Sequence, residues 1–157
     1  MHIFFWLHYI PLENSSIILS KILLKKARNK FFSFKDVKVA VLGLTFKPGT
    51  DDLREAPSLD NIKILLSEGA KIKAYDPIGE ENYKKIYPTE VEYTKTPQAA
   101  LEDAEICFIF TEWDEIKKIK PEEYVTIMKK PVIYDGRNLY DVETMKNNEI
   151  EYYSIGR

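Results

Sequence analysis

The sequence predicts an α/β fold: a Rossmann-like parallel sheet with helices on both faces, preceded by an N-terminal helical arm. Two observations predict it. From residue 36 onward, short apolar runs rich in β-branched residues alternate with helical stretches, which is typical of a parallel sheet covered by helices. The chain has 157 residues, 45% hydrophobic and 31% charged, which is enough for one domain with one hydrophobic core.

The first part of the chain, residues 1–34, differs in composition from the rest. Residues 1–12 are apolar and aromatic, but this run is too short to span a bilayer. It also lacks the positively charged start and the small-residue cleavage site of a secretory signal, so we expect a cytoplasmic protein. His2 and His8 lie in this arm without a positioned partner, and we expect neither to be catalytic.

Residues 13–32 are expected to form a helix. Its N-cap candidates are Asn14, Ser15 and Ser16, because their side-chain oxygens can accept from the first free amides. Its basic end contains Lys25, Lys26, Arg28 and Lys30. A connecting helix with a solvated basic end explains this charge run. A membrane-surface helix is the alternative, in which Phe31, Phe32 and Phe34 would lie at a lipid interface.

The remaining elements follow from the apolar pattern. The first strand is predicted at 37–42, where VKVAVL is rich in β-branched residues. A helix at 57–68 has Pro57 in its first turn and ends at Gly69. Further strands are expected at 71–75, 91–93, 105–111, 132–134 and 150–154, and further helices at 80–86, 97–103, 121–128 and 141–146. The run ICFIF makes the strand at 105–111 the best candidate for the centre of the sheet.

Charge and cysteine content exclude several classes of function. A formal net charge of -2 argues against a general nucleic-acid binder, which would normally be strongly basic. Cys107 is the one cysteine in the sequence, so an intrachain disulfide and a cysteine zinc cage are impossible, and we predict no metal site. Since Cys107 lies inside ICFIF, we expect it to be buried and inert.

The long loop at 43–57, GLTFKPGTDDLREAP, is the first candidate site, because ligands bind outside the carboxyl ends of parallel strands. It lacks the GxGxxG fingerprint of dinucleotide sites. Its cations, Lys47 and Arg54, could meet a phosphate. A second cluster, Asp135 to Asn138, follows the strand at 132–134 and includes Arg137.

Two cation-bearing loops at one edge of the sheet favour an anionic ligand. The alternative is an ordinary surface loop, in which acidic neighbours pair with the cations and no ligand is bound. The acidic neighbours in the first loop are Asp51, Asp52 and Glu55. Residue types thus predict where a ligand would bind, but they do not identify it.

The motif VAVLGLTFKPGTDDLREAPSL resembles the opening of the C-terminal domain of the UDP-glucose/GDP-mannose dehydrogenase family. The motifs AYDP, ICFIFTEWDEIK and YDGRN resemble later parts of that domain and occur in the same order. The resemblance covers residues 35–157 and implies a UDP-sugar-binding domain there, with 1–34 as an arm and connecting helix. The family oxidises the C6 alcohol of a nucleotide sugar to a carboxylate with two NAD molecules.

The resemblance also implies roles for individual residues. Phe46 and Lys47 match a Phe-Lys pair that contacts the nucleotide sugar. Arg137 matches an arginine that contacts the substrate, and Arg54 matches one that reaches towards NAD across the interdomain cleft. The family's catalytic cysteine lies in a glycine-rich segment of a central domain. These 157 residues contain no such segment and no NAD domain, so we assign no catalytic residue.

Three hypotheses remain open from the sequence. The first is a nucleotide-sugar-binding domain, most simply for a UDP-sugar. The second is a working oxidoreductase formed with a separately encoded N-terminal dehydrogenase half, to which the apolar arm would bind. The third is a non-catalytic interaction module, or relic, that kept the fold and lost its ligand. The first two require NAD as the cofactor, bound mainly outside these residues.

Overall fold

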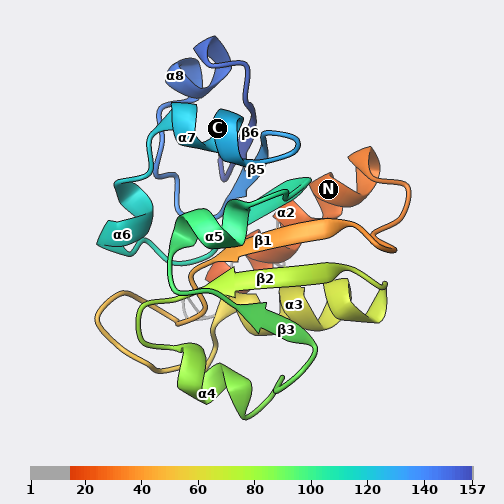
Figure 1. Ribbon diagram of the computed structural model, residues 1–157, viewed down its shortest axis with the longest axis vertical. Coiled ribbons are helices and arrows are strands. Elements are labelled where there is room, and N and C mark those ends of the chain that lie inside the picture. The colour runs from red at the N-terminus through yellow and green to blue at the C-terminus, as the bar shows by residue number, and fades with distance from the viewer. Residues whose placement is uncertain (1–14, 157) are drawn as a thin grey trace, which may run out of the picture.

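The computed structural model describes the backbone of residues 15–156 and the side chains of residues 21–156. Its strands form one parallel six-stranded sheet in the order β3-β2-β1-β4-β5-β6 (Figure 1). They are Lys38–Leu42 (β1), Lys71–Tyr75 (β2), Val91–Tyr93 (β3), Ile106–Ile109 (β4), Val132–Asp135 (β5) and Glu151–Ser154 (β6). This is the strand order of the Rossmann fold, so the predicted fold class is confirmed, with β4 at the centre beside β1.

The helices are Ser15–Lys30 (α2), Pro57–Ser67 (α3), Glu80–Lys84 (α4), Pro97–Leu101 (α5), Asp114–Lys117 (α6), Pro121–Ile127 (α7) and Val142–Asn147 (α8). The sequence did not predict α6, because four residues are too few to display a helical period. The strand expected at 105–111 is shorter than predicted. It ends at Ile109, and Thr111 instead bonds to the loop that follows β1.

Alternation along the strands divides the core between the two faces of the sheet. In β1, Val39 and Val41 pack into one cluster, whereas Ala40 and Leu42 pack into the other. Helices α2 and α3 cover the first face and lie behind the sheet in Figure 1, whereas α5 lies in front of it. Both faces of the central strands are therefore buried, as expected for a parallel sheet.

Helix α2 contributes directly to this core. Leu23, Leu24 and Ala27 are at most 3% exposed and belong to the same cluster as Phe108 and Tyr134 of the sheet. The outer side of α2 carries the basic residues Lys25 and Lys26, which are exposed. The described part of the connecting helix is thus packed on the sheet along one side and solvated along the other.

The end of α2 bears on the membrane-surface alternative. Phe34 is 1% exposed and Phe31 stacks on it with ring centroids 5.9 Å apart, while Phe32 is fully exposed. Phe34 therefore packs inside the protein and is not available to lipid. No helix within residues 15–156 is long and apolar enough to cross a membrane. Residues 1–14, which include His2, His8 and the N-cap candidate Asn14, lie outside the described residues. The side chains of the other two candidates, Ser15 and Ser16, do so as well.

Candidate functional site

The strand order reverses between β1 and β4, and the loops that follow these two strands meet there. Gly43 has φ +89°, and a Cβ on it would lie 2.5 Å from Thr111 Cβ. Thr111 Oγ1 donates to the carbonyl of Thr45 at 2.6 Å. The arrowheads in Figure 1 point towards this edge, where the long loop after β1 emerges. The loop after β1 therefore begins at the position where a Rossmann-like sheet binds its ligand.

Phe46 and Lys47 directly follow Thr45, whose carbonyl accepts from Thr111. The amide of Phe46 donates to the carbonyl of Asp52 at 3.0 Å, which closes the loop on itself. Phe46 is half-buried and Lys47 is exposed. Within residues 21–156, no carboxylate lies within ion-pairing distance of the Lys47 ammonium. Lys47 is thus a cation available to an anionic ligand at the predicted edge.

Arg54 lies further along the same loop and is held by a neighbour. Its Nη2 lies 2.8 Å from Asp52 Oδ2, and its Nε donates to Asp52 Oδ1 at 3.0 Å. The hydrogen bonds and charge of Arg54 lower the pKa of Asp52 to about 2. Arg54 therefore pairs with an acidic neighbour, as expected if the segment is an ordinary surface loop. The arginine side chain is 89% exposed, and exposed pairs of this kind contribute little to stability, so another partner could take its place.

The Asp135–Asn138 turn is built around a buried acid. Asp135 is 0% exposed and accepts from the amides of Arg137 and Leu139, each at 2.7 Å. Burial raises the pKa of Asp135, and these hydrogen bonds oppose that effect. Gly136 donates to the Ile109 carbonyl at 2.9 Å. Asp135 and Gly136 therefore fix the turn that carries the Arg137 side chain.

Arg137 forms a two-pronged ion pair with Glu112, the residue after Thr111. Its Nε and Nη2 both contact the Glu112 carboxylate, the latter at 3.3 Å. The arginine side chain is 24% exposed. Nη1 has no hydrogen bond to the part of the protein that the structure describes. Glu112 therefore orients the guanidinium and leaves one nitrogen for a ligand.

The segment after β4 joins the two predicted loops. Thr111 binds the loop after β1, and Glu112 binds the turn after β5. Among the described residues, no hydrogen bond or ion pair joins Arg137 to the Phe46–Lys47 pair. The sequence predicts Thr111 as the last residue of the strand and gives Glu112 no individual role. Its position at the carboxyl end of that strand was the signal available.

Asp76, directly after β2, is the other residue for which the sequence predicts no individual role. It is 4% exposed and accepts from the amides of Leu44 and Gly79 and from the Trp113 indole.

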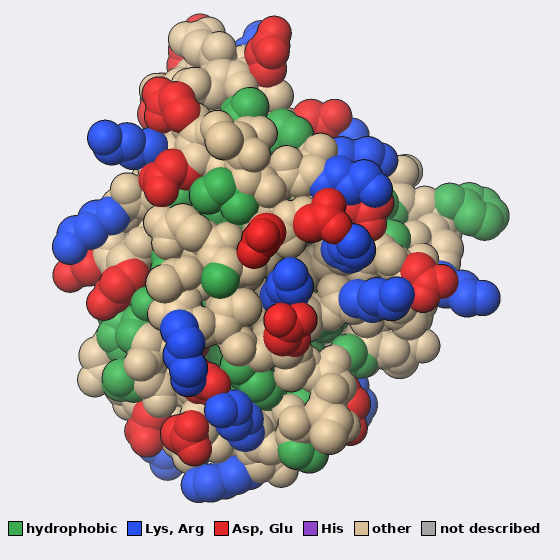
Figure 2. Space-filling model, viewed as in Figure 1, with side chains coloured by type: hydrophobic (Ala, Val, Ile, Leu, Met, Phe, Trp, Pro, Cys, Tyr) green, Lys and Arg blue, Asp and Glu red, His purple; other side chains and the backbone are tan. Residues whose placement is uncertain are grey.

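An open hollow of about 530 Å³ lies beside the loop after β1 and is lined by residues 50–54 and Asn82. Figure 2 shows basic and acidic side chains interspersed over the face it displays.

Neither a reactive thiol nor a metal centre is present among the described residues. Cys107 is 0% exposed, and burial raises the pKa of its thiol well above the usual range. No group of three or more His, Cys, Asp or Glu side chains that could hold a metal occurs within residues 21–156. The buried Cys107 is therefore not presented to a ligand at this edge.

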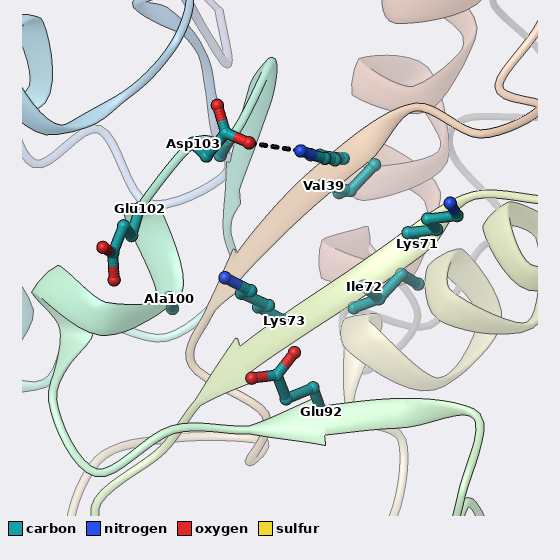
Figure 3. Close-up of a pocket in the computed structure, with 10 residues that line it drawn as sticks. Val39, Lys71, Ile72, Lys73, Glu92, Ala100, Glu102 and Asp103 are labelled. Atoms are coloured by element: carbon teal, nitrogen blue, oxygen red, sulfur yellow. Dashed lines mark hydrogen bonds and ion pairs between the residues drawn. The ribbon is translucent and has the colours of Figure 1, made fainter.

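A second pocket, of about 240 Å³, lies on the α5 side of the sheet, towards the amino ends of β1 and β2 (Figure 3). Lys38 and Lys71, the first residues of β1 and β2, line it together with Lys73, Glu92 and Asp103. Lys38 is ion-paired with Asp103, whose pKa this contact lowers. The pocket thus contains charges of both signs and lies away from the carboxyl ends of the strands.

Comparison with known proteins identifies the family. Residues 40–142 match the family model described as "UDP-glucose/GDP-mannose dehydrogenase family, UDP binding domain". UDP-glucose 6-dehydrogenase TuaD of Bacillus subtilis is 46% identical over 125 residues, which is 80% of this chain and 27% of the relative. UDP-glucose 6-dehydrogenase of Rickettsia conorii is 42% identical over 123 residues, 78% of this chain and 28% of the relative.

Solved structures give the same result. A UDP-glucose dehydrogenase from Pyrobaculum islandicum superposes with a TM-score of 0.70 at 26% identity, covering 88% of this chain and 29% of that one. A UDP-D-ManNAc dehydrogenase from Pyrococcus horikoshii superposes with a TM-score of 0.69 at 26% identity, covering 90% and 31%. The chain thus spans less than a third of the length of these relatives. It belongs to the UDP-glucose/GDP-mannose dehydrogenase family and corresponds to that family's UDP-binding domain.

Proposed function

We propose that this chain is the nucleotide-sugar-binding domain of a UDP-sugar 6-dehydrogenase, with Phe46, Lys47 and Arg137 as its ligand contacts. One observation carries the proposal. The Phe46–Lys47 pair of the family motif lies in the loop after β1, where the strand order reverses, and Lys47 is exposed there. A diphosphate would replace water at the ammonium, and the free Nη1 of Arg137 would add a directed hydrogen bond.

The oxidation of the C6 alcohol to a carboxylate requires more than this edge provides. NAD supplies the hydride acceptor when bound, and Arg54 is the residue here that would contact it. Because Arg54 lies in an exposed pair with Asp52, it can exchange that partner for a cofactor phosphate. The buried Cys107 does not serve as the thiol. We propose that the NAD site and the nucleophile are supplied by protein outside these 157 residues, for example a separate N-terminal half.

Calorimetric titration of the full chain with UDP, a UDP-sugar and NAD tests the binding step. We expect saturable binding of UDP and the UDP-sugar and much weaker binding of NAD. A folded chain that binds neither UDP nor the UDP-sugar would contradict the proposal and favour the non-catalytic interaction module.

Reconstitution tests the second step. The part of the Bacillus relative TuaD that precedes its aligned segment is mixed with this chain, and NADH formation from UDP-glucose is followed by absorbance. We expect NADH from the mixture and none from either component. A mixture that associates and still forms no NADH would contradict complementation while leaving the binding result intact.

A further inference from the structure

Asp76 is a buried acid surrounded by hydrogen-bond donors. Its Oδ2 accepts from the amides of Leu44 at 2.8 Å and Thr45 at 3.2 Å, and from the Trp113 indole at 3.0 Å. Its Oδ1 accepts from the amides of Ile78 at 3.1 Å and Gly79 at 2.7 Å. Five N–H groups therefore converge on one carboxylate that is 4% exposed.

These donors come from three segments that are distant in the sequence. Leu44 and Thr45 begin the loop after β1, Gly79 precedes α4, and Trp113 precedes α6. All three segments lie at the carboxyl edge of the sheet. Charge-assisted hydrogen bonds to a buried carboxylate are stronger than neutral ones. Asp76 therefore fixes the relative positions of the two loops that meet where the strand order reverses.

The network reaches Lys47 through Thr45. Thr45 is 0% exposed, and its hydroxyl lies 3.3 Å from Asp76 Oδ2 and 3.1 Å from the Lys47 carbonyl. Thr111 holds the Thr45 carbonyl from the other side. Only Phe46 stands between Thr45 and the exposed Lys47 in the sequence. Displacement of Thr45 would therefore move the Phe46–Lys47 pair away from the place where the loops after β1 and β4 meet.

The position of Asp76 also distinguishes this domain from a dinucleotide-binding one. In a Rossmann unit that binds NAD, an acid after the second strand accepts from the ribose hydroxyl. Here both carboxylate oxygens already face protein donors, and the side chain is closed off from solvent. Asp76 is thus built into the loop structure and is not presented to a ligand.

We propose that Asp76 is the positioning residue of the nucleotide-sugar site: it locks the loops after β1 and β4 so that Phe46 and Lys47 face the ligand. The inference rests on the proposed function and deepens it. In an Asp76→Asn variant, the amide group faces N–H donors in either orientation, so at least two hydrogen bonds are lost. The loops lose their common anchor, while the sheet itself keeps its pairing.

The test is calorimetric titration of the full chain with UDP, with circular dichroism as the check on folding. We expect Asp76→Asn to weaken UDP binding by about tenfold or more. Trp113→Phe removes one donor and keeps an aromatic ring, and we expect a loss of about threefold. Ile106→Val is the matched control, because it opens a small cavity at the amino end of β4, and its UDP affinity should stay that of the unchanged chain.

The outcomes separate the two proposals. If the unchanged chain does not bind UDP, the proposed function fails and this inference fails with it. If the unchanged chain binds UDP and a folded Asp76→Asn variant binds it equally well, only the positioning role is overturned. If Asp76→Asn does not fold, Trp113→Phe decides: weaker binding supports the role, and unchanged binding overturns it. A loss of affinity in Ile106→Val equal to that in Trp113→Phe would also overturn it, since destabilisation would then explain both.

Discussion

Arg54 and Arg137 stand at the same edge of the sheet, but the protein holds them differently. Arg54 is 89% exposed and pairs with Asp52 two residues away in its own loop. Arg137 is 24% exposed and pairs with Glu112 from another strand end. The second arrangement holds a guanidinium against a residue from another strand end, whereas the first leaves it exposed beside a neighbour in its own loop. This difference supports the proposal that Arg137 contacts the substrate and that Arg54 contacts the cofactor.

Replacement of each arginine tests this assignment. We expect Arg137→Ala to weaken UDP-sugar binding by about tenfold or more, because a charge-assisted hydrogen bond to the ligand is lost. Arg54→Ala removes the same charge and should leave UDP-sugar affinity within about twofold. Calorimetry on both variants measures the difference. Equal losses in the two variants would show that net charge, and not the position of Arg137, governs binding.

The single cysteine gives a second prediction at this scale. Because Cys107 is 0% exposed and burial raises its thiol pKa, the thiolate is scarce in the folded protein. We expect no reaction with a thiol-specific disulfide reagent at pH 8 in buffer and complete reaction in urea. Rapid labelling of the folded chain would refute the assignment of Cys107 as an inert core residue.

At the scale of elements, the loop after β1 depends on a close approach between two backbones. A Cβ on Gly43 would lie 2.6 Å from the Thr111 amide nitrogen, whereas one on Gly49 would meet nothing within 4 Å; both residues have positive φ. We expect Gly43→Ala to lower the free energy of unfolding by about 3 kcal/mol or more, from strain plus the clash. Gly49→Ala should cost about 1–2 kcal/mol, from backbone strain. Urea unfolding measures both, and equal costs would contradict the tight contact.

Helix α2 gives a prediction of the same kind. Leu23 is 0% exposed and lies near Gly136 in the turn that carries Arg137, whereas the adjacent Ile22 is 44% exposed. We expect Leu23→Ala to cost about 2–5 kcal/mol of unfolding free energy. Ile22→Ala should cost about 0.5 kcal/mol or less. If Leu23→Ala were as mild as its neighbour, α2 would not be part of the cooperative core.

Most elements were predictable because their signals are local. Gly69 follows α3 with φ +88°, and β2 and β3 have the predicted bounds, since charged and apolar residues alternate in each of these short strands. Strand order was not readable, because periodicity reports which face is buried and not which strand is the neighbour. The loop cations were predictable from residue type. The pairing of Arg137 with Glu112 and the bonds from the Leu44 amide and the Trp113 indole to Asp76 were not predictable, because these contacts join residues far apart in the sequence.

At the scale of the whole molecule, the sheet presents two edges with different chemistry. The carboxyl edge carries the family motif, an exposed lysine and an arginine oriented by a carboxylate. The amino edge carries a smaller pocket in which Lys38 and Asp103 neutralise each other. We therefore expect an anionic nucleotide to bind at the carboxyl edge.

The most direct test of this account is a map of the amide resonances of the full chain during titration with UDP. We predict that shifts concentrate in residues 43–56, 76–79, 111–113 and 135–139, at the carboxyl edge. Amides beside Lys38, Lys71 and Asp103 should stay unchanged. Shifts confined to that opposite edge, or no shifts at saturating UDP in a folded chain, would contradict the claim that this domain binds a nucleotide sugar between the loops after β1 and β5.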